Sequence, residues 1–259
     1  MAVAGIDVGS QSTKVVILEG DRILAAATLQ TGESGESEAR RAMEEALRQA
    51  RLTLEDMKSV VSTGAGRMSV PFARKQRSSM SCLARGAYFL YPQARTVLDA
   101  GAESSTAIRL SADGTVEDSV SNDRCAAGAG VFLDTVSRVL GIPLEEFGAE
   151  SLKATNAETI SSTCAVFAES EVISLVHRDP PAPIADILAG IHESMAGRLF
   201  GMVQRVGMQF EVVMSGGVSR NIGVVRAMEA KLGKRVLVPE DPRIVGALGA
   251  ALVARQGVA

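Results

Sequence analysis

The feature that most constrains the fold is a short pattern that occurs twice. Residues 2–8 form an apolar strand pattern that runs into Asp7-Val8-Gly9-Ser10-Gln11-Ser12, and a second strand pattern and a Glu-Gly-Asp turn follow. Residues 96–98 lead in the same way into Asp99-Ala100-Gly101-Ala102-Glu103-Ser104, a strand pattern and an Asp-Gly turn. Both stretches share Asp-x-Gly-x-x-Ser between two strands. The repeat predicts two related halves, each opening with a β-hairpin.

The rest of the chain alternates strand and helix patterns and predicts an α/β protein of two lobes. The first lobe is expected to comprise residues 1–95 and 240–259, and the second residues 96–239. Apolar residues at helical spacing predict helices over residues 36–51, 79–90, 126–140, 165–176, 184–206 and 242–255, and another that ends at Leu232. Short apolar runs predict further strands over residues 58–62, 211–215 and 235–238.

The composition argues against several classes of partner. The net charge is −3, and aromatic residues make up 3% of the chain with no Trp, which disfavours nucleic-acid binding. No run of 18 or more apolar residues occurs, and the N-terminus lacks a secretory signal pattern. We therefore expect a cytoplasmic protein with neither nucleic acid nor a membrane as partner.

The two turns suit phosphate binding, because backbone N–H groups can approach phosphate oxygens where glycine leaves no Cβ in the way. Asp7 and Asp99 end their strands and are expected to hold Mg²⁺ through water, since Mg²⁺ usually keeps several of its waters. Glu103 is expected near the terminal phosphate. Residues of both turns and of a third Gly-rich turn are expected to contact the nucleotide: Gly9, Ser10, Gln11, Ser12, Thr13, Lys14, Gly101, Ala102, Gly216, Gly217 and Asn221.

The third turn, Ser215-Gly216-Gly217, lies at a strand-to-helix junction and resembles the adenosine-binding turn of actin-like proteins. Neither a G-x-x-x-x-G-K-[ST] phosphate loop nor a dinucleotide-binding G-x-G-x-x-G fingerprint occurs in the required strand-to-helix setting. The two histidines, His177 and His192, have no partner spacing and are interpreted as structural.

Cys125 and Cys164 each precede a predicted helix, where the helix dipole and free N–H groups favour the thiolate. Thiolates hold iron–sulfur clusters, and a symmetric dimer would supply the four that a four-iron cluster needs. Both thiols could equally be small buried apolar groups, as we expect for Cys82.

Four segments closely resemble the activators of 2-hydroxyacyl-CoA dehydratases, a family that includes the ATPase subunits of benzoyl-CoA reductase. They are residues 5–14 and 122–130, residues 162–174 (Ser-Thr-Cys-Ala-Val-Phe-Ala-Glu-Ser-Glu-Val-Ile-Ser), and residues 216–221. The resemblance implies a duplicated actin-like fold of the ribonuclease H, sugar-kinase and Hsp70 type. It also implies a homodimer in which Cys125 and Cys164 hold one [4Fe-4S] cluster between subunits.

The resemblance further implies that ATP hydrolysis drives a low-potential electron into an acyl-CoA dehydratase or reductase, with ferredoxin or flavodoxin as the electron donor. Two segments depart from the family pattern. The second turn usually reads Asp-x-Gly-Gly-Gln-Asp, but Ala102, Glu103 and Ser104 stand here, and Leu83 replaces a usual His. Two alternatives stay open: a small-molecule kinase of the same fold, and a nucleotide-dependent interaction protein with little hydrolysis.

Overall fold

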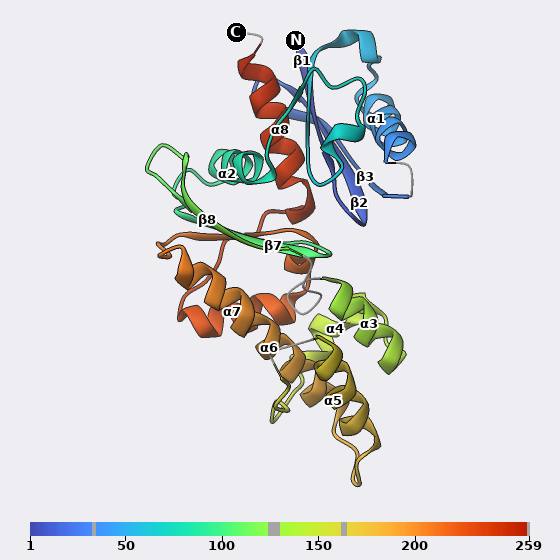
Figure 1. The fold of residues 1–259 in the computed structure, drawn as a ribbon, viewed down its shortest axis with the longest axis vertical. Helices are drawn as coiled ribbons and strands as arrows, with labels where there is room; N and C mark the ends of the chain where they lie inside the picture. Colours follow the sequence, from blue (N-terminus) through green and yellow to red (C-terminus); the bar gives the residue numbers. More distant parts are fainter. Residues whose placement is uncertain (33–34, 124–129, 162–164, 258–259) are drawn as a thin grey trace. The chain divides into compact units, whose positions relative to one another are not determined.

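The computed structural model describes residues 1–32, 35–123, 130–161 and 165–257. The chain divides into two compact units (Figure 1). Unit 1 comprises Met1–Arg95, Leu110–Glu117 and Glu240–Ala259, and unit 2 comprises Thr96–Arg109 and Asp118–Pro239.

Unit 1 contains a five-stranded sheet of order β3-β2-β1-β4-β5. Its strands are β1 (Ala2–Val8), β2 (Ser12–Glu19), β3 (Arg22–Gln30), β4 (Met57–Thr63) and β5 (Lys75–Gln76). β1 pairs antiparallel with β2 and parallel with β4. Nearly every residue of β1 is buried, because helices cover both faces of this sheet.

The helices of unit 1 are α1 (Glu36–Ala50), α2 (Ser79–Leu90) and α8 (Val245–Gln256). α1 covers one face of the sheet through its alanines, Met43 and Leu47. α8 packs on the opposite face and α2 packs on α8 (Figure 1). α8 can lie so close because glycines stand at its contacts: a Cβ on Gly5 of β1 would fall 2.0 Å from the Ala247 carbonyl oxygen.

Unit 2 contains a four-stranded sheet of order β8-β7-β6-β9, and a parallel bridge from Val213 to Leu237 extends it. Its strands are β6 (Thr96–Ala100), β7 (Ser104–Leu110), β8 (Val116–Asp123) and β9 (Val212–Ser215). The helices are α3 (Gly130–Leu140), α4 (Leu144–Ser151), α5 (Ala165–His177), α6 (Ile184–Arg205) and α7 (Ile222–Leu232). One apolar core joins the sheet to these helices.

The two sheets have the same topology. In each, a first strand pairs antiparallel with the strand that follows it and parallel with a strand from much later in the unit. The order β3-β2-β1-β4 therefore corresponds to β8-β7-β6-β9. The expectation of two related halves, each opening with a hairpin, is confirmed.

We expect Gly249→Ala to lower the free energy of unfolding by about 3 kcal/mol, as overpacking of a dense core can. A Cβ at this position of α8 would fall 1.7 Å from the carbonyl oxygen of Cys82, so α8 and α2 must separate. Gly201→Ala in α6 is the matched control, because no atom lies within 4 Å of its added Cβ. The control should gain about 0.5–1 kcal/mol from helix propensity. Urea unfolding of both variants checks the opposite signs, and equal effects would contradict the packing argument.

Candidate functional site

The two predicted phosphate turns have the same geometry. The amide of Gly9 donates to the Ser12 carbonyl at 3.1 Å, and the amide of Gly101 donates to the Ser104 carbonyl at 2.9 Å. Asp7 pairs with Lys14 across the first hairpin, and Asp99 pairs with Thr106 across the second. The hydrogen-bonded glycine and serine lie two and five residues after the aspartate in both units, and the cross-strand partner lies seven residues after it. The two turns therefore follow their aspartates with the same spacing and the same pairing.

In each unit, the strand that carries the aspartate pairs in parallel with a later strand, and a glycine just after that later strand packs against it. Gly64 follows β4 at φ +91° and Gly216 follows β9 at φ +87°, a region that side chains rarely adopt. A Cβ on Gly64 would fall 2.4 Å from the Val8 carbonyl oxygen, and one on Gly216 would fall 2.2 Å from that of Ala100. Backbone of the third turn thus lies directly against the residue that follows Asp99.

In unit 1, Asp7 is enclosed by backbone. A Cβ on Gly64 would fall 2.3 Å from one carboxylate oxygen of Asp7, and one on Gly246, near the start of α8, 3.1 Å from the other. Burial raises the pKa of Asp7 above its ordinary value of 3.8, although the nearby Lys14 cation lowers it in part. A carboxylate whose pKa is raised by desolvation is a common component of a functional site.

The remaining residues of the first turn differ in their exposure. Ser10 and Gln11 are exposed at the tip, and Lys14 donates to the Ser12 carbonyl at 3.1 Å. The Thr13 hydroxyl is buried and lies 2.9 Å from that of Thr31. The exposed tip is therefore accessible to an anion, whereas the Thr13 hydroxyl is engaged with Thr31, which directly follows β3.

In unit 2, the second turn supports the start of α3. Gly130 and Val131, the first residues of α3, donate their amides to the Gly101 and Ala102 carbonyls at 2.8 and 2.9 Å. Glu103 is exposed at the tip of the same turn. The Gly101 turn is thus fixed to a helix on one side and open to solvent on the other.

The third turn connects β9 to α7. Ser215 donates its hydroxyl to Asp99 at 2.7 Å, which joins the second and third turns within unit 2. The Asn221 carboxamide oxygen accepts from the amides of Gly223 and Val224 and so caps α7. The structure therefore brings Asp99, Gly101, Gly216 and Asn221 into one connected region of unit 2, and Asp7, Gly9 and Lys14 into one region of unit 1.

The predicted cluster ligands, Cys125 and Cys164, lie outside the described residues. Cys82 is fully buried in α2, and burial raises the pKa of its thiol to about 11, which makes it a poor metal ligand. Among the described residues, no group of three or more His, Cys, Asp or Glu side chains could hold a metal ion.

The sequence interpretation missed Thr63-Gly64. This pair is the counterpart in unit 1 of Ser215-Gly216, since Asp7 pairs with Thr63 where Asp99 pairs with Ser215. The run Thr63-Gly-Ala-Gly66 after a predicted strand could have indicated this turn. It shares only the glycine with Ser215-Gly216, however, so the sequence does not show that the two turns correspond.

Comparison with known proteins identifies the family. Residues 4–254 match the profile of the BadF/BadG/BcrA/BcrD ATPase family. The chain belongs to this family. It is 46% identical to the activator of lactoyl-CoA dehydratase from Anaerotignum propionicum over 255 residues. The aligned region covers 98% of this chain and 97% of that protein. The expected resemblance to the dehydratase activators is confirmed.

The solved structures support the fold. The activator of 2-hydroxyisocaproyl-CoA dehydratase from Clostridium difficile, solved with bound ADPNP, superposes with a TM-score of 0.94 and 43% identity, covering 100% of this chain and 96% of that one. A ROK-family glucokinase from Streptomyces griseus shares the fold alone, at a TM-score of 0.59 and 16% identity over 99% of this chain and all of that one. The predicted actin-like α/β fold and the ATPase assignment are confirmed. No helix within the described ranges is long and apolar enough to span a membrane.

We expect Gly216→Ala to destabilise unit 2 by about 2 kcal/mol, because it combines positive-φ strain with overlap against the Ala100 carbonyl. Gly217→Ala is the matched control: its φ is not positive, and no atom lies within 4 Å of its added Cβ. Thermal unfolding should leave the control near the parent protein. A similar loss in both variants would show that the turn does not depend on Gly216.

We expect Asp7→Asn to raise the melting temperature of the nucleotide-free protein at pH 7, by about 2 °C or more. The folded protein holds the Asp7 proton more tightly than the unfolded chain does. Protonated Asp7 therefore stabilises the fold fully below pH 3.8, and this contribution is lost as the pH rises through the raised pKa. An amide carries no such penalty. The gain should therefore shrink toward pH 4.

Asp56→Asn is the control of opposite sign. Asp56 is exposed, and hydrogen bonds from the Thr53 amide and hydroxyl lower its pKa. Its ionised form is favoured in the folded protein, so the substitution should leave the melting temperature unchanged or lower it. A fall in the melting temperature on Asp7→Asn would contradict the assigned cost of the Asp7 charge.

Proposed function

We propose that this protein is an ATP-dependent electron activator. It binds ATP, hydrolyses it, and delivers a low-potential electron from a [4Fe-4S] cluster, shared by two copies of the chain, to an acyl-CoA dehydratase or reductase. The relatives support the class of partner, since the two described above are activators of acyl-CoA dehydratases. The electron itself would come from a reduced ferredoxin or flavodoxin in the cytoplasm.

The nucleotide would be held by the two equivalent turns. In this proposal Asp7 and Asp99 bind Mg²⁺ through water, and Lys14 and the exposed hydroxyl of Ser10 meet phosphate oxygens. The backbone amides at the tips of the two turns, residues 10–11 and 102–103, would supply neutral donors. The Gly216-Gly217 turn, fixed to Asp99 through Ser215, forms the wall for adenosine. Mg²⁺ would neutralise charge on the phosphates during hydrolysis.

The observation that carries the coupling is the pair of hydrogen bonds from Gly130 and Val131 to Gly101 and Ala102. α3 begins on the carbonyls of the turn that is proposed to hold phosphate, and Cys125 precedes α3 by only a few residues in the sequence. A movement of this turn between ATP and ADP would therefore shift the start of α3. Hydrolysis would act as a conformational switch, since no phosphoryl group needs to be transferred.

The second turn keeps its shape despite its unusual sequence. The hydrogen bond from the Gly101 amide to the Ser104 carbonyl at 2.9 Å matches that of the first turn, so Ala102, Glu103 and Ser104 do not distort it. Glu103 is exposed at the tip and would lie near the terminal phosphate. We propose that the turn stays competent for ATP and that Glu103 contributes to the hydrolysis step.

The ligand count implies a dimer. A four-iron cluster takes four thiolates, and Cys82 is buried with a raised thiol pKa, which leaves two thiols in each chain. Two copies related by a two-fold axis would place all four thiolates at the axis. Helix N-termini behind Cys125 and Cys164 would favour the thiolate form.

Cysteine substitution tests this proposal. Cys125→Ser and Cys164→Ser should each bleach the anaerobically purified protein, because each removes two of the four ligands by symmetry. Cys82→Ser is the matched control and should retain about two irons per chain. Iron analysis, visible absorption and size-exclusion chromatography are the measurements. Four irons on a verified single chain would contradict the shared cluster.

A further inference from the structure

His192 lies on α6, buried with 1% exposure, and packs against the first turn of α7. Its Nε2 atom lies 3.1 Å from the Asn221 side-chain nitrogen. A Cβ on Gly223 would fall 2.2 Å from its Nδ1 atom, so the ring contacts the α7 backbone closely. Gly148 of α4 also packs closely against Asn221, since a Cβ added to it would fall 3.0 Å from the Asn221 side-chain oxygen.

The hydrogen bonds of Asn221 fix the state of this ring. Its oxygen accepts from the Gly223 and Val224 amides at 2.9 and 3.4 Å, so its nitrogen must face His192 as a donor. Nε2 must then accept, which requires a neutral imidazole with its proton on Nδ1. Burial lowers the pKa of His192 to about 4, and the ring is therefore neutral at pH 7.

The Nδ1 proton has no hydrogen-bond partner among the described residues, although the atom is fully buried. Leaving a buried donor unpaired costs free energy that a leucine of similar size would not incur. The hydrogen bond that the ring makes to Asn221 therefore uses its acceptor atom, Nε2.

Nε2 of His192 is linked to Asp99 through hydrogen bonds and the backbone of residues 215–221. Asn221 donates its amide to the Val218 carbonyl at 3.0 Å, and Ser219 donates its hydroxyl to the Ser215 carbonyl at 2.8 Å. Ser215 then bonds Asp99 at 2.7 Å. The Gly216–Arg220 turn is thus held by Asp99 where it begins and by His192, through Asn221, where it ends.

We propose that His192 is a positioning residue for nucleotide binding, which holds Asn221 and so fixes the exit of the Gly216-Gly217 turn without touching the nucleotide. The inference rests on the proposed function, because it takes that turn to be the adenosine wall. It deepens the interpretation of His192 as a structural residue, since its hydrogen bond and not its bulk is what the turn requires.

Substitution of the ring separates the hydrogen bond from packing. His192→Leu keeps bulk but removes the acceptor, and should weaken Mg·ADP binding by about tenfold or more, equivalent to about 1.4 kcal/mol. His192→Gln places an amide oxygen near the Nε2 position and should bind within about threefold of the parent protein. Glu193→Gln, an exposed neighbour on α6, is the control and should bind normally. Isothermal titration with ADP and thermal unfolding are measured for all variants.

Nitrogen-15 NMR of the imidazoles gives an independent signature. The chain has two histidines, and the exposed His177 is the internal reference. His192 should show the proton on Nδ1, and Asn221→Asp should move it to Nε2, because a carboxylate oxygen can only accept. This variant keeps the cap and the packing, so it tests the pair even if His192→Leu fails to fold.

Two results would overturn the positioning role alone: a wild-type ring protonated at Nε2, or a His192→Leu protein that melts earlier yet binds ADP normally. A wild-type protein that shows the expected tautomer but does not bind ADP would instead overturn the nucleotide site on which the role depends.

Discussion

The structure depends on the close contact between a glycine after one strand and the carbonyl group that follows the aspartate on the neighbouring strand. Gly64 lies over Val8 in this way in unit 1, and Gly216 lies over Ala100 in unit 2. Only a residue without a Cβ can hold the backbone this near at positive φ. The contact sets the register of β4 on β1 and of β9 on β6, and it places backbone beside Asp7 and Asp99.

The same constraint explains why polar groups gather at one end of each sheet. Parallel pairing of the first strand with the late strand brings two strand ends together, and the hairpin turn adds a third segment. Burial there raises the pKa of Asp7, which costs stability until a cation balances its charge. In unit 2 the turn carries α3 on its carbonyls, so a ligand at the turn would act directly on a helix.

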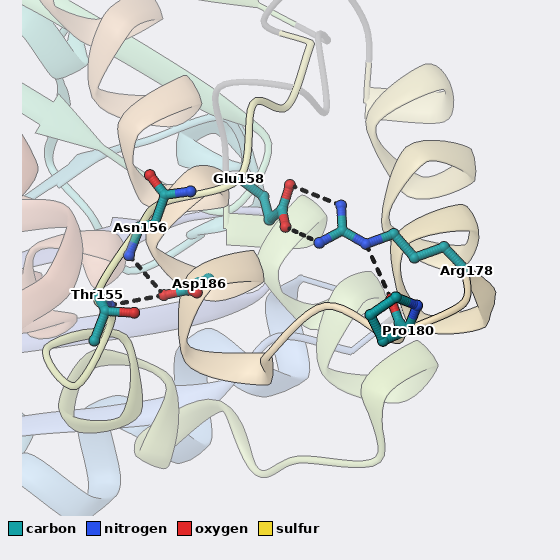
Figure 2. A network of polar contacts seen from close by, with 6 residues as sticks. All are labelled: Thr155, Asn156, Glu158, Arg178, Pro180 and Asp186. Atoms are coloured by element: carbon teal, nitrogen blue, oxygen red, sulfur yellow. Dashed lines mark hydrogen bonds and ion pairs between the residues drawn. The ribbon is translucent and has the colours of Figure 1, made fainter.

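Unit 2 also shows how polar contacts are used away from the turns. The Asp186 carboxylate, near the start of α6, accepts from the amides of Thr155 and Asn156 at 2.8 and 3.1 Å (Figure 2). Arg178, just after α5, forms a two-point contact with Glu158 at 2.6 and 3.3 Å. These contacts hold residues 155–158 to both α5 and α6. Together with the hydrogen bond from the Glu158 amide to the Asp186 carbonyl, they anchor the chain that leads from α4 toward α5 outside any helix or strand.

The sequence by itself predicted the duplicated hairpins and most of the helices, because local apolar periodicity and the Asp-x-Gly-x-x-Ser spacing lie in contiguous residues, but it missed α4. The resemblance of four short segments indicated the family. The sequence also indicated Asp7, Asp99 and the Gly216 turn as candidates. Tertiary structure alone decided that Thr63-Gly64 is the counterpart of Ser215-Gly216, that α3 starts on the Gly101 turn, and that Asn221 is shared between a helix cap and His192. Each of these joins residues far apart in the chain, and no local pattern encodes which backbone groups will meet when two strands pair in parallel.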